Sequence, residues 1–185
     1  MENLRPEGTR LLERLEALDA RVRHLCGDLS ADGLARQPSP GAWSIGAVLE
    51  HLLLAGEFYL DAMAAAVTHM GEGARAPELL PWRPSFFGGL LERSLRPEST
   101  RKLPAPRILQ PAPAPRPDVV AAFLAQQSAV AERVRTYADL DWNRVRLGSP
   151  VNRLIRMNLG DALTILVTHA ERHAGQIERT RLSLL

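Results

Sequence analysis

The sequence predicts an all-α protein, a four-helix bundle with a long, proline-rich crossover between helices two and three. Apolar residues recur at steps of three and four residues in four long segments, which is the spacing of a helix with one buried face. No segment shows the alternating pattern of a strand, and the prolines fall outside the four segments. Because 185 residues fit one domain, residues 1–185 are expected to fold together.

The first helix is predicted over residues 7–26, and a glycine and an aspartate follow it as a helix stop. Its apolar positions are Leu11, Leu12, Leu15, Leu18, Val22 and Leu25. Residues 28–43 are expected to form a connection, since two of them are prolines that a continuous helix excludes. Cys26 is the only cysteine, so no internal disulfide is possible, and we expect a packed or half-exposed thiol near the helix end.

The second helix is predicted over residues 44–69. Ser44 is a suitable N-terminal cap, with Trp43 directly before it. The apolar positions of this helix are Ile45, Val48, Leu52, Ala55, Tyr59, Leu60 and Met63. Glycines at positions 71 and 73 close the helix.

Residues 71–117 form the predicted crossover. Ten of the fourteen prolines lie between Pro77 and Pro117, so a long helix is excluded there. The apolar run from Phe86 to Leu95 is expected to form a short helix that packs on the bundle, because a disordered segment would seldom carry so many apolar groups. The sequence leaves open whether this run covers a site or lies at a dimer interface.

The third helix is predicted to have Pro117 and Asp118 in its first turn and to run to about residue 138. Residues 139–159 are expected to form another crossover, which contains Trp142, Gly148 and Pro150. The fourth helix then starts near Gly160, with Asn158 as a candidate cap.

The charge of the chain excludes some partners and compartments. The net charge is +2 and the pI is about 9.2, but arginines are mixed with acids along the chain, so no nucleic-acid partner is expected. Apolar stretches are broken well before the ~18–20 residues of a membrane span, and the N-terminus lacks a signal-peptide pattern. We therefore expect a cytoplasmic protein with no membrane partner.

His169 and His173 are the first candidate metal ligands. They are four residues apart in a predicted helix, so they share one face and can bind one ion. In the helical zinc motif of metalloproteases a glutamate follows the first histidine, whereas Ala170 follows it here. The metalloprotease motif is thus excluded, and chance spacing on a partly exposed face stays open as the alternative.

His51 is the candidate third ligand if helices two and four are neighbours. By itself, a histidine in this apolar helix can equally be a neutral core residue with one satisfied nitrogen. His69 in the same helix lies roughly 27 Å from His51 at about 1.5 Å rise per residue, so the two cannot share an ion. His24 is expected to be a surface residue near a helix C-terminus.

Three imidazoles suit zinc, nickel, copper or iron better than magnesium or calcium. We expect one divalent transition metal ion, with zinc or nickel favoured. Three protein ligands leave at least one coordination position for water or substrate, and such open sites are catalytic more often than structural.

Other polar residues lie close to these histidines in the sequence. Gln176 is near the same helix face as the pair and is expected either to orient water or substrate or to be an interhelical amide. Glu171 points away from that face, and neither Glu50 nor Glu57 is well placed as a general base. Arg172 is favoured as an ion-pair partner over an anion-binding residue. No catalytic base is therefore identified.

Two histidine-bearing segments resemble the DinB-like superfamily. The segment 40–52, PGAWSIGAVLEHL, looks like the second-helix motif of that family. The segment 159–177 looks like the fourth-helix motif of that family, His-x-x-Arg-His-x-x-Gln. In this sequence the motif reads HAERHAGQ. Residues 103–111 are similar to one branch of the superfamily. The resemblance spans most of the chain.

The resemblance implies a four-helix bundle, His51, His169 and His173 as metal ligands, and homodimers as the usual assembly. Similar proteins include S-transferases that use low-molecular-weight thiols, a mycothiol-dependent isomerase and proteins described as metal-dependent hydrolases. We expect a metal-dependent enzyme acting on a small-molecule substrate. Transfer of a low-molecular-weight thiol is slightly favoured over hydrolysis, because it explains an open site without an acid or base. The alternative is a non-catalytic metal- or ligand-binding dimer.

Overall fold

The computed structural model describes residues 4–76, 78, 80–99, 104–112, 114–149 and 155–185. Pro77, Leu103 and Pro150, which the sequence assigns to the crossovers, lie outside the described residues. The long helices are α1 (Pro6–Cys26), α3 (Ile45–Met70), α5 (Val119–Thr136) and α6 (Leu159–Leu184). The shorter elements are α2 (Ala31–Ala35), η1 (Gly71–Ala74), α4 (Phe86–Leu95), η2 (Arg107–Leu109), β1 (Arg146–Gly148) and β2 (Arg156–Asn158).

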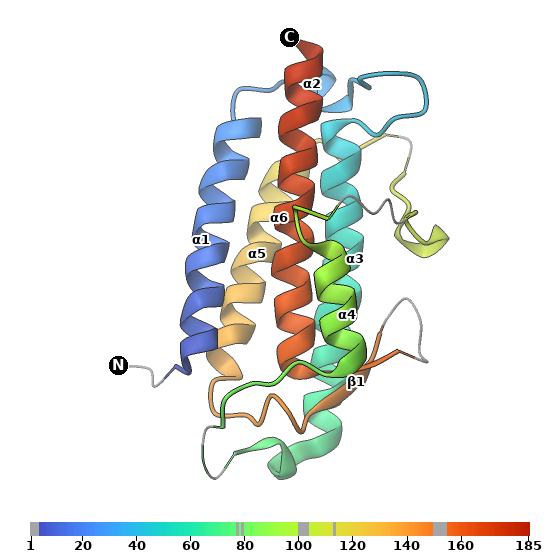
Figure 1. Cartoon of the computed structure of the whole chain (residues 1–185). Coiled ribbons are helices and arrows are strands. Elements are labelled where there is room, and N and C mark those ends of the chain that lie inside the picture. Colours follow the sequence, from blue (N-terminus) through green and yellow to red (C-terminus); the bar gives the residue numbers. More distant parts are fainter. Residues whose placement is uncertain (1–3, 77, 79, 100–103, 113, 150–154) are drawn as a thin grey trace.

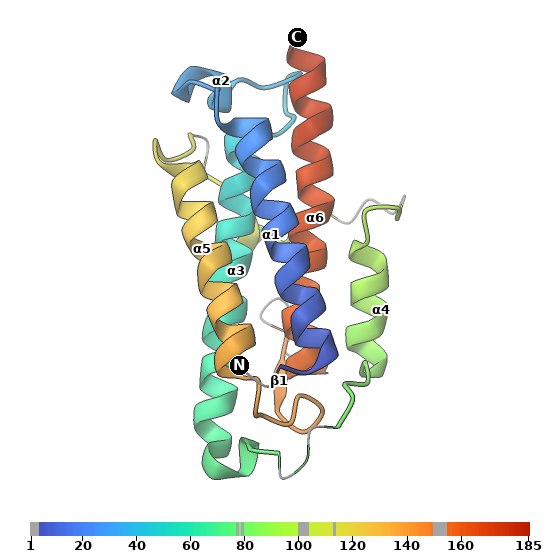
Figure 2. The same ribbon diagram turned by 90° about the vertical axis from the view of Figure 1, so that its left-hand side faces the viewer.

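The four long helices lie lengthwise side by side (Figures 1 and 2), and the prediction of a mainly helical chain is confirmed. Helix α3 packs against α5 and α6, and α1 packs against the same two helices on the other side. Helices α3 and α6 run in opposite directions, with the C-terminus of α6 beside the start of α3 (Figure 1). They are therefore neighbours, as a shared histidine site requires.

Side-chain caps set the starts of several helices. The Ser44 hydroxyl accepts a hydrogen bond from the Ala47 N–H at 3.1 Å, which satisfies an otherwise unpaired donor at the start of α3. Asn158 and Asp161 form a reciprocal capping box at the start of α6. Ser44 and Asn158 therefore cap their helices as the sequence predicted. The third helix begins at Val119, so Pro117 and Asp118, both expected in its first turn, lie before it.

The core consists of two apolar clusters stacked along the helices. The cluster nearer the start of α3 includes Val22, Ile45 and Phe123, and the other includes Met63, Trp142 and Leu163. Cys26 is buried in the first cluster, in agreement with the expected packed thiol. Each cluster takes side chains from α1, α3, α5 and α6, so burial of apolar area ties the four helices together at both ends.

Helix α4 stands outside the four long helices, against α6 (Figure 2). Two glycines permit this close approach. A Cβ at Gly88 would lie 2.2 Å from Asp161 Cγ, and a Cβ at Gly160 would lie 2.3 Å from Trp82 Cδ1. The apolar run in the crossover thus forms a helix that packs on the long helices, as predicted.

Two elements differ from the sequence prediction. The crossover at 139–159 contains a two-stranded antiparallel sheet in which Leu147 pairs with Met157, although no strand was expected. The connection at 28–43 contains the short helix α2, capped by Ser30. Strands of three residues and a helix of five are too short for their side-chain periodicity to be recognised.

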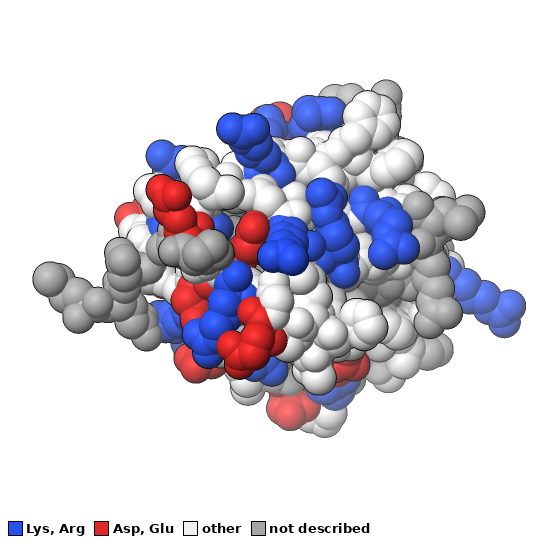
Figure 3. All heavy atoms as spheres, turned by 90° about the horizontal axis from the view of Figure 1, so that it is seen from below, with Lys and Arg blue, Asp and Glu red and all other residues white. Residues whose placement is uncertain are grey.

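The end of the molecule that carries the sheet has a mixed charge. Seen from below, it shows a group of basic side chains with acidic side chains beside it (Figure 3). Arg144, Arg146 and Arg156 are exposed in the sheet and the loop before it. The absence of a nucleic-acid partner stays a prediction.

In the part of the chain that the structure describes, no helix combines the length and apolar character needed to cross a membrane.

Candidate metal centre

Helices α3 and α6 bring three histidines together. His51 comes from α3, and His169 and His173 come from consecutive turns of α6. One ring nitrogen of each lies within 4.8 Å of those of the other two. The His51 Nε2 to His169 Nε2 distance is 3.2 Å. Nitrogens bound to one zinc ion at about 2.0–2.1 Å with tetrahedral angles lie roughly 3.3 Å apart, so the spacing fits a common ion.

The His51 ring is oriented by a backbone carbonyl. Its Nδ1–H donates to the Leu109 oxygen at 2.7 Å, which leaves Nε2 as the lone-pair nitrogen that faces His169. The ring is only 3% exposed and lies 5.0 Å from the Trp43 ring, centroid to centroid. Metal-binding histidines commonly have such a partner for their second nitrogen, which fixes tautomer and orientation.

Gln176 orients the third ring in the same way. The His173 Nδ1–H donates to the Gln176 side-chain oxygen at 2.8 Å, so Nε2 keeps its lone pair. Gln176 thus lies near the histidine face, as its spacing predicts. In the structure its side-chain oxygen is hydrogen-bonded to His173.

Burial keeps the three rings neutral. It is the largest cause that lowers the pKa of His51, and it lowers the pKa of His169 well below its ordinary range, with the neighbouring histidines adding to the effect. Burial, followed by the charge of His51, lowers the pKa of His173 to about 4. Neutral imidazoles are the form that binds metal ions.

The same geometry tests the alternative of a neutral histidine core. His51 and His173 both donate their Nδ1–H to groups other than the three histidines, so both keep a lone pair on Nε2. His169 can donate one Nε2–H to only one of them. At least one imidazole lone pair is then left for a metal ion or water, so the donor set fits a divalent transition metal.

The carbonyl that orients His51 belongs to a segment we call the strap, residues 104–112 and 114–117. Glu50, the residue before His51, holds the strap: its Oε1 accepts from the Arg116 backbone N–H at 2.8 Å and from Arg116 Nε at 2.9 Å. Its Oε2 accepts from the guanidinium at 3.1 Å. A Cβ at Gly46, one turn earlier, would lie 2.6 Å from Pro115 Cγ, so the strap lies directly on α3.

A cavity of about 720 Å³ opens beside the histidines. The strap forms one wall through Pro104, Ala105, Pro106 and Leu109, and α4 forms another through Leu91 and Leu95. The opposite face of α4 is open to solvent, with Phe86 78% and Phe87 48% exposed. The Phe86–Leu95 run therefore lines the site with one face and exposes Phe86 and Phe87 on the other.

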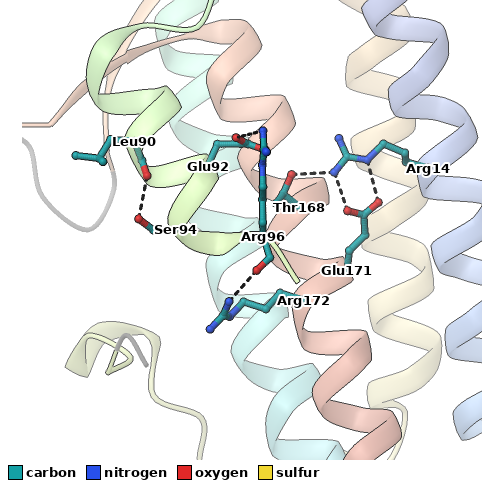
Figure 4. Close-up of polar contacts among 8 residues, drawn as sticks. All are labelled: Arg14, Leu90, Glu92, Ser94, Arg96, Thr168, Glu171 and Arg172. Atoms are coloured by element: carbon teal, nitrogen blue, oxygen red, sulfur yellow. Dashed lines mark hydrogen bonds and ion pairs between the residues drawn. The ribbon is translucent and has the colours of Figure 1, made fainter. Parts of the chain in front are cut away.

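Two charged residues of α6 beside the histidines point in different directions, Arg172 toward the cavity and Glu171 toward α1 (Figure 4). Arg172 lines the cavity and donates from Nη1 to the carbonyl oxygens of Arg96 at 2.8 Å and Ser99 at 2.9 Å. Glu171 pairs with Arg14 of α1 through two hydrogen bonds of 2.9 and 2.7 Å. It points away from the cavity, as helical phase predicts.

The remaining histidines lie apart from the centre. His24 and His69 are exposed in the last turns of α1 and α3. Among the described residues, the group with metal-binding geometry contains only His51, His169 and His173.

Sequence reasoning missed several residues of the site. The Leu109 carbonyl and the Glu50–Arg116 pair join segments far apart in the chain, and no local pattern marks them. Arg179 lines the cavity and could have been found, because it is seven residues after Arg172 and so lies on the same helix face.

Comparison with known proteins gives one match. A family model described as the DinB superfamily matches residues 14–177, which include the three histidines and the strap. No curated protein and no solved structure matches the chain.

Proposed function

Since this chain belongs to the DinB superfamily, we propose that it is a metal-dependent enzyme acting on small molecules. In this proposal the four long helices are the four-helix bundle of the family. His51, His169 and His173 hold one divalent transition metal ion, with zinc or nickel preferred.

The convergence of three neutral imidazoles at the edge of a 720 Å³ cavity carries the proposal. A structural zinc site is normally closed by four protein ligands, whereas a site with three ligands beside a cavity has room for a substrate. When bound, the metal ion would supply Lewis acidity and lower the pKa of a coordinated group.

The chain's own residues prepare this site. The Leu109 carbonyl and Gln176 hold two of the rings with a lone pair directed inward. Burial of His51 excludes bulk water from one side. The strap and α4 give the substrate an apolar enclosure.

Transfer of a low-molecular-weight thiol is the version we favour over hydrolysis. Among the described residues that line the cavity there is no aspartate or glutamate to act as a general base. Thiol transfer does not require one, since metal coordination alone favours loss of the thiol proton. A cavity of this size also weighs against the alternative of a non-catalytic module, which predicts a site filled by side chains.

A homodimer, the assembly that the resemblance implies, is part of this proposal. It is tested by light scattering coupled to size-exclusion chromatography at several concentrations. A mass of two chains would support the dimer, and a mass of one chain at all concentrations would contradict it.

The first experiment is elemental mass spectrometry on protein prepared without a histidine tag, next to a His51→Ala/His169→Ala variant. We expect close to one metal ion per chain and its loss in the variant. The loaded protein is then assayed with low-molecular-weight thiols and electrophiles. If no metal binds after reconstitution with zinc, nickel and manganese, the metalloenzyme proposal fails.

A further inference from the structure

The end of the cavity nearest the two-stranded sheet is apolar except for two hydroxyl groups. His51, Ala55 and Tyr59 line the cavity at four-residue steps of α3, so this end extends roughly 12 Å past His51 at about 1.5 Å rise per residue. Ile165 lines the same end from α6, because the two helices run in opposite directions. In this direction from the histidines, the described wall residues carry no charge, and Tyr59 and Ser149 supply the polar groups.

The sheet brings Ser149 to Tyr59. Strand β1 packs against α3, and Ser149 directly follows β1, where its N–H donates to the Ile155 oxygen at 2.7 Å. Ser149 is 2% and Tyr59 6% exposed, and their side chains are hydrogen-bonded. Burying a hydroxyl beside apolar groups costs free energy, and a phenylalanine would avoid that cost. Apolar packing alone therefore does not account for the hydroxyl of Tyr59.

The Tyr59 hydroxyl keeps its proton at physiological pH. Burial raises its pKa to about 12, and the hydrogen bond with Ser149 opposes that rise. A hydrogen bond lowers the pKa of a phenol when it is donated to the phenolic oxygen, because it then stabilises the ionised form. The serine is therefore the donor in this pair, and the single proton of the phenol is left for an acceptor in the cavity.

We propose that the cavity takes a neutral, mainly apolar organic molecule with a carbonyl oxygen, and that the Tyr59 hydroxyl donates a hydrogen bond to this oxygen. Tyr59 is then a specificity-determining residue, and Ser149 orients its hydroxyl. The inference deepens the proposed function, on which it rests for the reaction at the histidines. In the thiol-transfer version, the molecule with the carbonyl is the electrophile.

Two probes of nearly equal shape test the proposal on the full chain. Acetophenone carries a carbonyl oxygen where α-methylstyrene carries a methylene group. Tyr59→Phe removes only the hydroxyl, so we expect it to weaken acetophenone binding about five-fold and to leave α-methylstyrene binding unchanged. Ligand-detected nuclear magnetic resonance measures both dissociation constants. By infrared spectroscopy, the carbonyl stretch of bound acetophenone should lie lower in the wild type than in the variant, because a hydrogen bond weakens the C=O bond.

Tyr137→Phe is the matched control. Tyr137 is the other tyrosine of the chain and is buried in the same apolar cluster as Tyr59, but it does not line the cavity. The control should leave both probes unaffected. Equal changes for the two probes in Tyr59→Phe, an unchanged carbonyl stretch, or no binding of either probe would each overturn the proposal. Metal content, measured on the same samples, reports separately on the metalloenzyme proposal, because probe binding requires no reaction.

Discussion

At the scale of single residues, the candidate centre depends on hydrogen bonds that act behind the histidines. A ring that can rotate or change tautomer loses affinity for a metal ion, because each lone pair must be directed before the ion binds. The Leu109 carbonyl orients His51 from 58 residues further along the chain. Its own position depends on the strap, and Glu50 is the carboxylate that holds the strap on α3.

Glu50→Gln is therefore expected to weaken metal binding without removing any ligand. A neutral amide cannot accept the three Arg116 hydrogen bonds with the strength of a carboxylate, so the Leu109 carbonyl would be held less firmly. We expect zinc affinity to fall about ten-fold, the lower end of the range for residues behind metal ligands. Competition with a chromophoric chelator measures the affinity.

Glu171→Gln is the control for this change. Glu171 is also a carboxylate in a two-bond pair with an arginine, and it is two residues from His169, but its pair faces α1. The control should keep wild-type affinity. Equal losses in the two variants would show that Glu50 acts only through general stability.

The buried thiol of Cys26 predicts a pH dependence of stability. Burial raises its pKa from 9.0 to about 11, so the folded state resists ionisation that the unfolded chain undergoes first. The contribution of the neutral thiol is complete below about pH 9 and is lost as the pH rises through about 11. The free energy of unfolding should fall over this range.

Urea unfolding from pH 8 to pH 10.5 measures this effect, with Cys26→Ala as the comparison. The variant loses packing at every pH but should show a shallower decline above pH 9, because buried tyrosines still contribute. Parallel curves for wild type and variant would exclude the thiol as a cause.

At the scale of elements, the joint between α4 and α6 is the most specific contact outside the long helices. The Asp161 carboxylate is 1% exposed and accepts hydrogen bonds from the backbone N–H of Asn158 at 2.9 Å and the Ser85 hydroxyl at 2.5 Å. One carboxylate thus caps α6 and anchors the residue that caps α4. This joint places the inner face of α4 along the cavity.

Gly160→Ala tests this joint. An added Cβ would meet the rigid Trp82 ring, whose Nε1–H already donates to Asn158 at 3.0 Å, so the ring cannot move without breaking that bond. We expect a loss of about 2–3 kcal/mol in the free energy of unfolding, as for overpacked cores. Denaturant titration followed by circular dichroism measures the change.

Gly56→Ala is the comparison variant. Its Cβ would meet the Gln126 side-chain amide 2.1 Å away, but that group is the flexible end of its side chain and can turn aside at the cost of one hydrogen bond, from its Nε2 to the Leu53 oxygen. The cost should stay near or below about 1 kcal/mol, since alanine also favours the helix. A cost equal to that of Gly160→Ala would contradict the role assigned to Trp82.

The long elements could be predicted from the sequence because helix periodicity and caps are local. Ser44 and Asn158 mark helix starts within three residues of the groups they bind. The triad could be expected once α3 and α6 were assumed to be neighbours, since His169 and His173 share a face. The strap could not, because its position depends on Glu50 and Arg116, 66 residues apart, and on a carbonyl that every residue has.

At the scale of the whole molecule, the candidate centre joins three parts of the fold. One ligand comes from α3, two come from α6, and the strap connects to both the α3 ligand and the cavity wall. The two apolar clusters bury side chains from the four long helices at either end. A metal ion bound between α3 and α6 would therefore oppose separation of the helices and not merely order one loop.

Zinc is accordingly expected to raise the melting temperature of the whole chain in a single transition, as a chain that folds as one domain should show. A ligand that binds only the folded state at one hundred times its Kd adds about 2.7 kcal/mol of stability. For a chain of this size that corresponds to a shift of about 5–10 °C. Differential scanning calorimetry with and without zinc measures the shift in melting temperature.

Glu171→Gln should keep the shift and His51→Ala/His169→Ala should lose it. An equal shift in the double variant would mean that zinc binds elsewhere, and two separate transitions would mean that the metal stabilises only part of the chain.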